Sequence, residues 1–163
     1  MNTTALQAGV DYDFDYIQGR VILAQPLSSS SSGGGLIGGI GAVLKNANPK
    51  TRVIGVSAKN SAALAASMQA GEIVDTDHFN TLADGVAGGV DKGSVTLPLA
   101  MRVIDEVLIC DEAEIASALK RMALDENQIV EGAAALALAG FIQIVDRLRS
   151  QTSVVLICGA NFD

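Results

Sequence analysis

The chain has 163 residues, enough for one domain with a substantial core, and 49% of them are apolar while only 4% are aromatic. Its formal net charge of −7 disfavours nucleic acid and anionic membrane surfaces as partners. Cys110 and Cys158 lack metal-ligand spacing, and the first residues lack a signal-peptide pattern. We therefore expect a cytoplasmic protein with no membrane segment and no metal site. Its Ala, Val, Ile and Leu content is typical of parallel strands covered by Ala-rich helices.

The N-terminal half begins with a polar, irregular segment at residues 1–25 and continues into a domain at residues 26–163. A proline and a run of serines separate the two. In chain order, the predicted elements of this half are a strand at 21–24, a helix from 36 to the stop at 46–49, a strand at 52–57, a helix at 61–70 and a loop at 72–93.

The C-terminal half repeats the alternation of helices and strands. Asp111 and Glu114 have the spacing of a capping box, which predicts the start of a helix. In chain order, the predicted elements are a helix at 96–104, a strand at 106–110, a helix at 111–123, one or two helices at 129–149 and a buried strand at 153–158. Strands separated by helices predict a three-layer α/β fold, with a mainly parallel sheet covered by helices on both faces.

A serine and glycine segment precedes the first predicted helix. Gly33, Gly34 and Gly35 can bring several backbone N–H groups onto a phosphate, because they lack a Cβ and can adopt positive φ. Ser32 can add a hydroxyl, and a helix that begins near Leu36 adds the positive end of its dipole. The segment therefore predicts a phosphate-binding loop; the alternative is a flexible linker, which would not continue directly into an apolar helical pattern.

Two other phosphate-binding motifs fit the segment less well. Gly33, Gly35 and Gly38 match G-x-G-x-x-G, but the next predicted strand ends without the acidic residue that binds the ribose of NAD. NADP remains an alternative through Ser57 and Lys59. No lysine follows the glycines directly, so the segment is not a P-loop.

Several ordered blocks from residue 18 onward resemble the serine/threonine dehydratases, pyridoxal-phosphate enzymes of fold type II, including the hydroxyectoine-utilization dehydratase-like members. The resemblance covers the C-terminal part of that family and implies an incomplete large domain similar to that of the tryptophan synthase β chain. The matching blocks are Ser32-Gly33-Gly34-Gly35-Leu36-Ile37, Arg52-Val53-Ile54-Gly55-Val56, Thr81-Leu82-Ala83-Asp84-Gly85, Val130-Glu131-Gly132-Ala133 and Cys158-Gly159-Ala160-Asn161.

The resemblance implies pyridoxal phosphate as cofactor and gives individual residues a role. The segment from Ser32 through Gly33, Gly34 and Gly35 to Leu36 would hold the cofactor phosphate. Cys158 matches the residue that hydrogen-bonds the pyridine nitrogen, and Glu131 matches a carboxylate close to the ring. Asp84 and Gly85 match a loop that borders the active site. His78, the single histidine, shows no catalytic partner and is expected at the surface.

The family's lysine motif, which holds the cofactor covalently, lies upstream of every matched block and has no counterpart here. No catalytic residue is therefore identified. The resemblance implies an ammonia-lyase that acts by β-elimination on a small hydroxy amino acid, in a truncated or split form that is inactive alone unless a second chain completes it. The alternative is a non-catalytic module that binds a phosphorylated ligand or NADP. Apolar surface left by a missing neighbour predicts a homo-oligomer.

Overall fold

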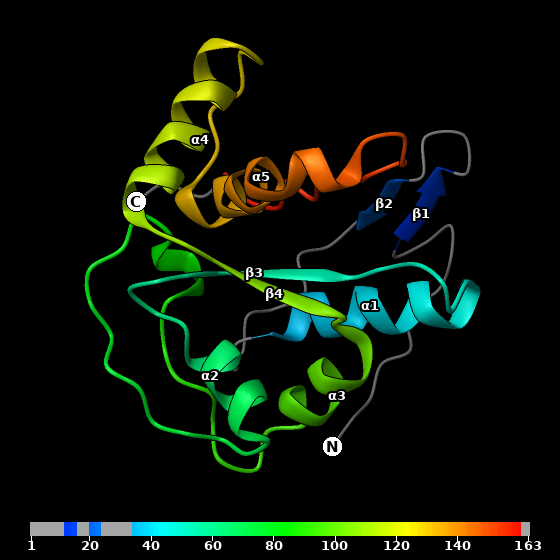
Figure 1. The fold of residues 1–163 in the computed structure, drawn as a ribbon, viewed down its shortest axis with the longest axis vertical. Helices are drawn as coiled ribbons and strands as arrows, with labels where there is room; N and C mark the ends of the chain where they lie inside the picture. Colours follow the sequence, from blue (N-terminus) through cyan, green and yellow to red (C-terminus); the bar gives the residue numbers. More distant parts are fainter. Residues whose placement is uncertain (1–11, 16–19, 24–33, 161–163) are drawn as a thin grey trace.

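The computed structural model describes residues 12–15, 20–23 and 34–160 of the chain. Within these ranges, the elements in chain order are β1 (Tyr12–Asp15), β2 (Arg20–Leu23), α1 (Gly35–Ala47), β3 (Ile54–Ala58), α2 (Ala63–Ala70), the 3-10 turn η1 (Asp84–Val86), α3 (Thr96–Val103), β4 (Glu106–Cys110), α4 (Glu112–Leu124), α5 (Gly132–Ile144) and the 3-10 turn η2 (Val145–Leu148) (Figure 1).

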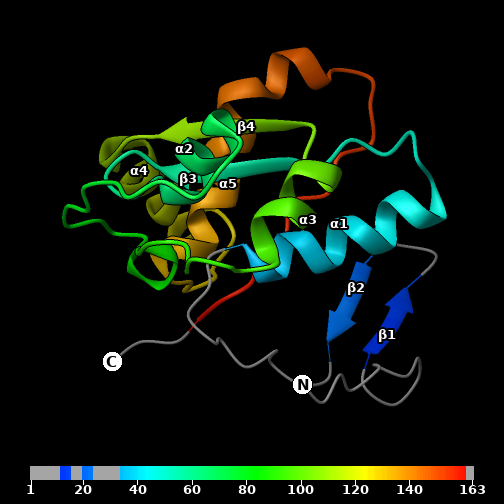
Figure 2. The ribbon, with the colours of Figure 1, turned by 90° about the horizontal axis from the view of Figure 1, so that it is seen from below.

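The centre of the domain is a parallel pair of strands. β3 and β4 pair in register from Ile54 opposite Glu106 to Ala58 opposite Cys110. Helices α1, α2 and α3 cover one face of this pair, and α4 and α5 lie on the other face (Figures 1 and 2). The predicted α/β class, with parallel strands between two helical layers, is therefore confirmed. β1 and β2 form a separate antiparallel pair.

The helix boundaries follow from local sequence signals. The Asp111 side chain accepts a hydrogen bond from the Glu114 N–H at 3.0 Å, and the Glu114 carboxylate accepts one from the Asp111 N–H at 2.8 Å. The predicted capping box at the start of α4 is thus present. α2 ends at Gly71, whose φ of 76° is in the left-handed region that favours glycine.

The main core lies between the strands and helices α4 and α5. Ala58 and Cys110, at the ends of β3 and β4, are fully buried there together with Ile115 of α4. Alanines of α5 fill the remaining space, which allows that helix to approach the strands closely. Within the described residues, no helix is both long enough and apolar enough to cross a membrane.

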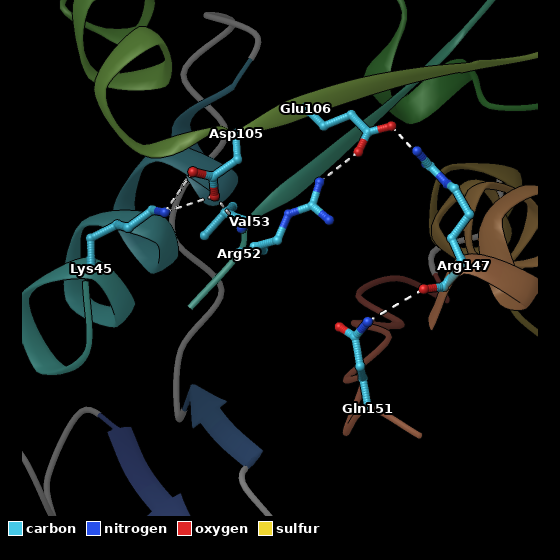
Figure 3. Close-up of polar contacts among 7 residues, drawn as sticks. All are labelled: Lys45, Arg52, Val53, Asp105, Glu106, Arg147 and Gln151. Atoms are coloured by element: carbon cyan, nitrogen blue, oxygen red, sulfur yellow. Dashed lines mark hydrogen bonds and ion pairs between the residues drawn. The ribbon is translucent and has the colours of Figure 1, made fainter. Parts of the chain in front are cut away.

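Ion pairs hold the amino ends of the two parallel strands together (Figure 3). Lys45 of α1 pairs with Asp105 at 2.7 Å, and the same carboxylate accepts the Val53 N–H at 2.7 Å. These two hydrogen bonds, that from Lys45 first, lower the pKa of Asp105 despite some desolvation. Because the folded-state pKa lies below the unfolded one, this stabilisation is present at neutral pH and is lost as the pH falls through the folded-state pKa.

Glu106 extends the same network toward the C-terminal part of the chain. Its two carboxylate oxygens accept hydrogen bonds from Arg147 at 2.7 Å and from Arg52 at 2.8 Å (Figure 3). The hydrogen bond from Arg147 is the largest cause of the lowered pKa of Glu106. The carbonyl of Arg147 in turn accepts a hydrogen bond from the Gln151 side chain at 3.3 Å. The start of β4 is therefore tied to α1, to the residue before β3 and to η2.

Three predicted boundaries differ from the structure. The segment at 153–158 is extended but forms no strand, because none of the described strands pairs with it. The helix predicted at 129–149 is shorter: α5 starts at Gly132, and after Ile144 the chain tightens into η2. The N-terminal segment expected to be irregular contains β1, whose partner β2 lies at the predicted strand 21–24.

Two glycines of α1 provide a matched test of helix packing. Gly39 is exposed, and a Cβ there would meet no atom within 4 Å in the part of the chain that the structure describes. Gly39→Ala should therefore raise the free energy of unfolding by about 0.5–1 kcal/mol. Gly41 is buried and a Cβ there would lie 2.6 Å from Val103 Cγ2 of α3. Gly41→Ala should therefore lower the free energy of unfolding by about 1–3 kcal/mol. Urea denaturation of both variants checks the opposite signs; two changes of equal sign would contradict the packing of α1 on α3.

Candidate functional site

Most of the residues selected from the sequence lie on one side of the parallel pair, where β3 and β4 end. Helices α1, α4 and α5 all begin on this side (Figures 1 and 2). In open α/β sheets, ligands bind outside the carboxyl ends of the strands, where helix N-termini offer free N–H groups. The ion pairs of Asp105 and Glu106 lie at the opposite, amino ends of the same strands.

The N-terminus of α1 is shaped for an anion. Gly34 precedes the helix with a φ of 96°, a left-handed conformation in which a side chain would be strained. Among the described residues no side chain caps the helix, and its first turn holds no acidic residue. A Cβ on Gly35 would meet no atom of the described residues within 4 Å, so the space beside it is open to that part of the chain. Ser32 and Gly33, predicted to join this loop, lie outside the described residues.

Glu131 lies at the start of α5 and connects three segments of the chain. Its N–H donates a hydrogen bond to the Gly159 carbonyl at 3.2 Å, which fixes the C-terminal segment. Its own carbonyl accepts the N–H groups of Ala134 at 3.1 Å and Ala135 at 3.0 Å, as the first bonds of the helix. The half-buried Glu131 side chain is therefore held on a rigid helix end.

Three glycines leave room around this carboxylate. A Cβ on Gly132 would overlap the Leu82 carbonyl oxygen, and one on Gly159 would overlap the Glu131 side chain. A Cβ on Gly85 would lie 3.6 Å from Glu131 Oε1, in ordinary contact. The segment 82–85, the start of α5 and the C-terminal segment thus meet around Glu131, at distances that glycine alone permits at Gly132 and Gly159.

Cys158 is an exposed free thiol next to this cluster. Its pKa is raised, first by the partial burial of the thiol and then by the Glu131 carboxylate. The thiol therefore keeps its proton at neutral pH and can donate a hydrogen bond. Cys110 differs, because it is fully buried in the core and its desolvation raises its pKa to about 11.

The structure gives two sequence-selected residues a more local role. Asp84 is exposed, and its carboxylate accepts the N–H of its neighbour Gly85 at 2.9 Å. His78 is exposed as predicted, and its Nδ1 lies 2.8 Å from the Ser61 hydroxyl, a partner that the sequence did not indicate. Leu36, in the first turn of α1, is half-buried.

Sequence reasoning missed the contribution of Leu82 and of Ser61. Both act through contacts between segments distant in the chain, and nothing in their own sequence neighbourhood indicates such contacts. Ser57, considered for a nucleotide phosphate, lines a small apolar cavity of about 50 Å³ between α1, α2 and the strands. A cavity of this size does not hold a nucleotide, which argues against the NADP interpretation.

A family model described as pyridoxal-phosphate dependent enzyme matches residues 25–159 of the chain. The chain belongs to this family. It is 34% identical to the L-threonine ammonia-lyase of Thermotoga maritima, over 80% of this chain and 32% of the relative. It is also 34% identical to the catabolic L-threonine dehydratase of Escherichia coli, over 80% of this chain and 40% of the relative.

Solved structures show the same relationship. A crystal structure of threonine deaminase from T.th. is similar with a TM-score of 0.73 and 32% identity, over 81% of this chain and 48% of that one. Maize serine racemase is similar with a TM-score of 0.73 and 30% identity, over 81% of this chain and 42% of that one. The chain thus spans less than half the length of these relatives.

The described residues fit the family's cofactor, pyridoxal phosphate. The uncapped start of α1 with its left-handed Gly34 matches a phosphate, which needs backbone N–H groups and positive potential. A protonated Cys158 thiol suits a neutral ring nitrogen, which accepts a hydrogen bond. The glycines around Glu131 let the segment 82–85 and the C-terminal segment pack directly against it, which holds the carboxylate near Cys158.

The charge of Glu131 should control the reactivity of Cys158. The carboxylate disfavours the thiolate, so Glu131→Gln should lower the pKa of Cys158 and speed its reaction with Ellman's reagent at a fixed pH near 8. The rate of thiol modification as a function of pH measures this shift. Glu114→Gln is the matched control, because Glu114 acts on the buried Cys110 instead. An unchanged pH profile of Cys158 in Glu131→Gln would contradict the proximity of the two side chains.

Proposed function

We propose that this chain carries the cofactor-binding wall of a pyridoxal-phosphate-dependent ammonia-lyase that acts by β-elimination on a small hydroxy amino acid, serine or threonine. The observation that carries the proposal is the uncapped N-terminus of α1, which begins on the side where β3 and β4 end (Figure 1). The Glu131 carboxylate near the Cys158 thiol supports it. The names of the relatives, threonine dehydratases and ammonia-lyases, support the substrate class.

Each residue has a defined task in this proposal. Ser32, Gly33, Gly34, Gly35 and Leu36 hold the phosphate through backbone N–H groups and the Ser32 hydroxyl. The phosphate adds its negative charge at the positive end of the α1 dipole, where it is stabilised. The same segment orients the cofactor, because a phosphate bound by several converging N–H groups has little freedom to rotate.

The remaining residues act on the ring side. Cys158 would donate a hydrogen bond from its thiol to the ring nitrogen, which stays uncharged. Glu131 would lie beside the ring. Asp84 and Gly85 border the substrate side. When bound, the cofactor would supply a ring that accepts electron density from the substrate. An uncharged ring nitrogen makes the ring a weaker electron acceptor, which suits elimination of a β-hydroxyl group.

We propose that the lysine which binds the cofactor covalently is supplied from outside these 163 residues, by another segment or a second chain. Lys45 is engaged with Asp105 at the amino ends of the strands, on the side away from the site. Lys59 follows β3 directly, so it is the lysine of this chain that comes nearest to the carboxyl ends in sequence. A covalent cofactor on Lys59 would therefore overturn this part of the proposal.

Cofactor binding can be tested with two glycines at helix ends. Gly34→Ala should weaken binding of pyridoxal phosphate roughly tenfold or more, since a hydrogen bond to a charged group contributes about 1.5–3 kcal/mol. Gly71→Ala is the control, because Gly71 also has positive φ but lies at the C-terminal end of α2 and not in the glycine segment before α1. Quenching of the cofactor's fluorescence measures the affinity of each variant.

Reduction with borohydride separates the competing functions. We expect reversible binding with no cofactor fixed to one lysine, and no conversion of serine or threonine to the oxoacid and ammonia. Stoichiometric fixation or turnover by the purified chain would contradict the absence of the lysine. Absence of any binding, together with affinity for NADPH, would favour the nucleotide-binding alternative.

We also propose that the chain associates, with itself or with a completing chain. Large apolar side chains are exposed on several elements, with Val95 at 79%, Ile129 at 69% and Val154 at 66% of their full exposure. Such surface favours burial against a partner. Multi-angle light scattering at increasing concentration should show species above the monomer mass of 16.7 kDa. A monomer at the highest concentration would count against self-association.

A further inference from the structure

The loop between α2 and α3, residues 72–95, is long for a compact domain and carries the site residues Asp84 and Gly85. Its irregular backbone must be held by contacts outside the loop if Gly85 is to stay beside Glu131. Several of these contacts come from the short turn that follows β3, and the Leu82 N–H also donates to the Glu112 carboxylate of α4 at 2.8 Å. This turn contains Asn60 and Ser61.

Ser61 is held in place by contacts that do not involve the loop. Its N–H donates to the Ala58 carbonyl at 3.1 Å, and Ala58 is a fully buried end residue of β3. Lys59, the first residue after β3, donates its N–H to the Cys110 carbonyl at the end of β4 at 2.8 Å. Ser61 itself is 5% exposed. Its hydroxyl is therefore a fixed point on the carboxyl edge of the parallel pair.

The loop has an approaching limb at residues 78–80 and a leaving limb at residues 88–89. The Ser61 hydroxyl contacts both limbs. It accepts the Gly88 N–H at 3.0 Å, on the limb that leaves the site, and lies 2.8 Å from His78 Nδ1, on the limb that approaches it. Since the oxygen already accepts from Gly88, its own hydrogen is available for a neutral imidazole that carries its proton on Nε2. The two limbs also approach each other directly, because a Cβ on Gly89 would lie 4.0 Å from His78 Nε2.

Asn60 reinforces the approaching limb. Its carbonyl accepts the Phe79 N–H at 2.9 Å, and its side-chain amide donates to the Asn80 carbonyl at 2.7 Å. Between the two limbs, the segment 81–87 runs out to α5, where Gly85 packs beside Glu131. The base of the segment is thus held by the Ser61 hydroxyl, which binds both limbs, together with Asn60.

We infer that Ser61 is a positioning residue for the candidate site: with His78 and Gly88, its hydroxyl closes the base of the segment that places Gly85 beside Glu131. The inference concerns the site of the proposed function, but its structural part requires no cofactor. Loss of the hydroxyl leaves the Gly88 N–H and the imidazole without a shared partner. The segment then separates from α5, and water reaches the Glu131 carboxylate.

The test compares Ser61→Ala with Ser67→Ala in the isolated chain without cofactor. Ser67 is also buried and accepts a loop N–H, that of Val74 at 3.2 Å, but it touches neither limb of the closed segment. Hydrogen exchange of single amides by NMR is the first measurement. In Ser61→Ala the Gly88 and Gly85 amides should exchange roughly tenfold faster, the change expected for one net hydrogen bond. In Ser67→Ala only the Val74 amide should respond.

The reaction of Cys158 with Ellman's reagent is the second measurement, and a merely structural role of Ser61 would not change it. Partial burial and the Glu131 charge raise the pKa of Cys158, and both weaken when water enters, so the thiol should react faster in Ser61→Ala. Ser67→Ala should leave the rate unchanged. His78→Ala, a second variant, should speed exchange of the Phe79 amide while Gly88 stays protected.

Two results would overturn the inference. The first is faster exchange at Gly88 in Ser61→Ala with unchanged exchange at Gly85 and an unchanged Cys158 rate, which would confine Ser61 to a local contact. The second is equal effects of Ser61→Ala and Ser67→Ala on the Cys158 rate. Failure of pyridoxal phosphate to bind would contradict the proposed function alone, since neither measurement uses the cofactor.

Discussion

The candidate site depends on the absence of a side chain at Gly132 and at Gly159. The Leu82 carbonyl lies where a side chain on Gly132 would begin, and the Glu131 side chain lies where one on Gly159 would begin. Three segments that are far apart in the chain can therefore meet around one carboxylate. Any larger residue at either glycine would push the loop or the C-terminal segment away, and Glu131 would lose the surroundings that connect it to Cys158.

The two ends of the parallel pair serve opposite purposes. At the amino ends, Asp105 and Glu106 are each neutralised by cations from other elements, and this fixes the relative position of α1, β3 and β4 (Figure 3). At the carboxyl ends, α1 begins without a capping side chain and without an acidic residue in its first turn. Among the described residues, the first turn of α1 therefore has no side-chain partner for its N–H groups, which can bind an anion.

The sequence predicted local features better than long-range ones. The capping box of Asp111 and Glu114, the strand Glu106–Cys110 and the stop of α2 at Gly71 depend on neighbouring residues, and all three are present. The strand expected at 153–158 failed, because an apolar run becomes a strand only where another strand pairs with it. The partner of His78 could not be predicted either, since Ser61 lies 17 residues away across an irregular loop.

The described contacts around Glu131 lie within residues 34–160 and hold this wall of the candidate site together. The N–H of Glu131 is bound by Gly159, Gly85 packs beside its carboxylate, and Ser61 holds the base of the segment that brings Gly85 there. A wall that is formed in advance loses little conformational entropy when a ligand arrives. Under the proposed function, this chain would therefore supply a preorganised surface for the phosphate and ring, and the covalent attachment of the cofactor would fall to residues outside it.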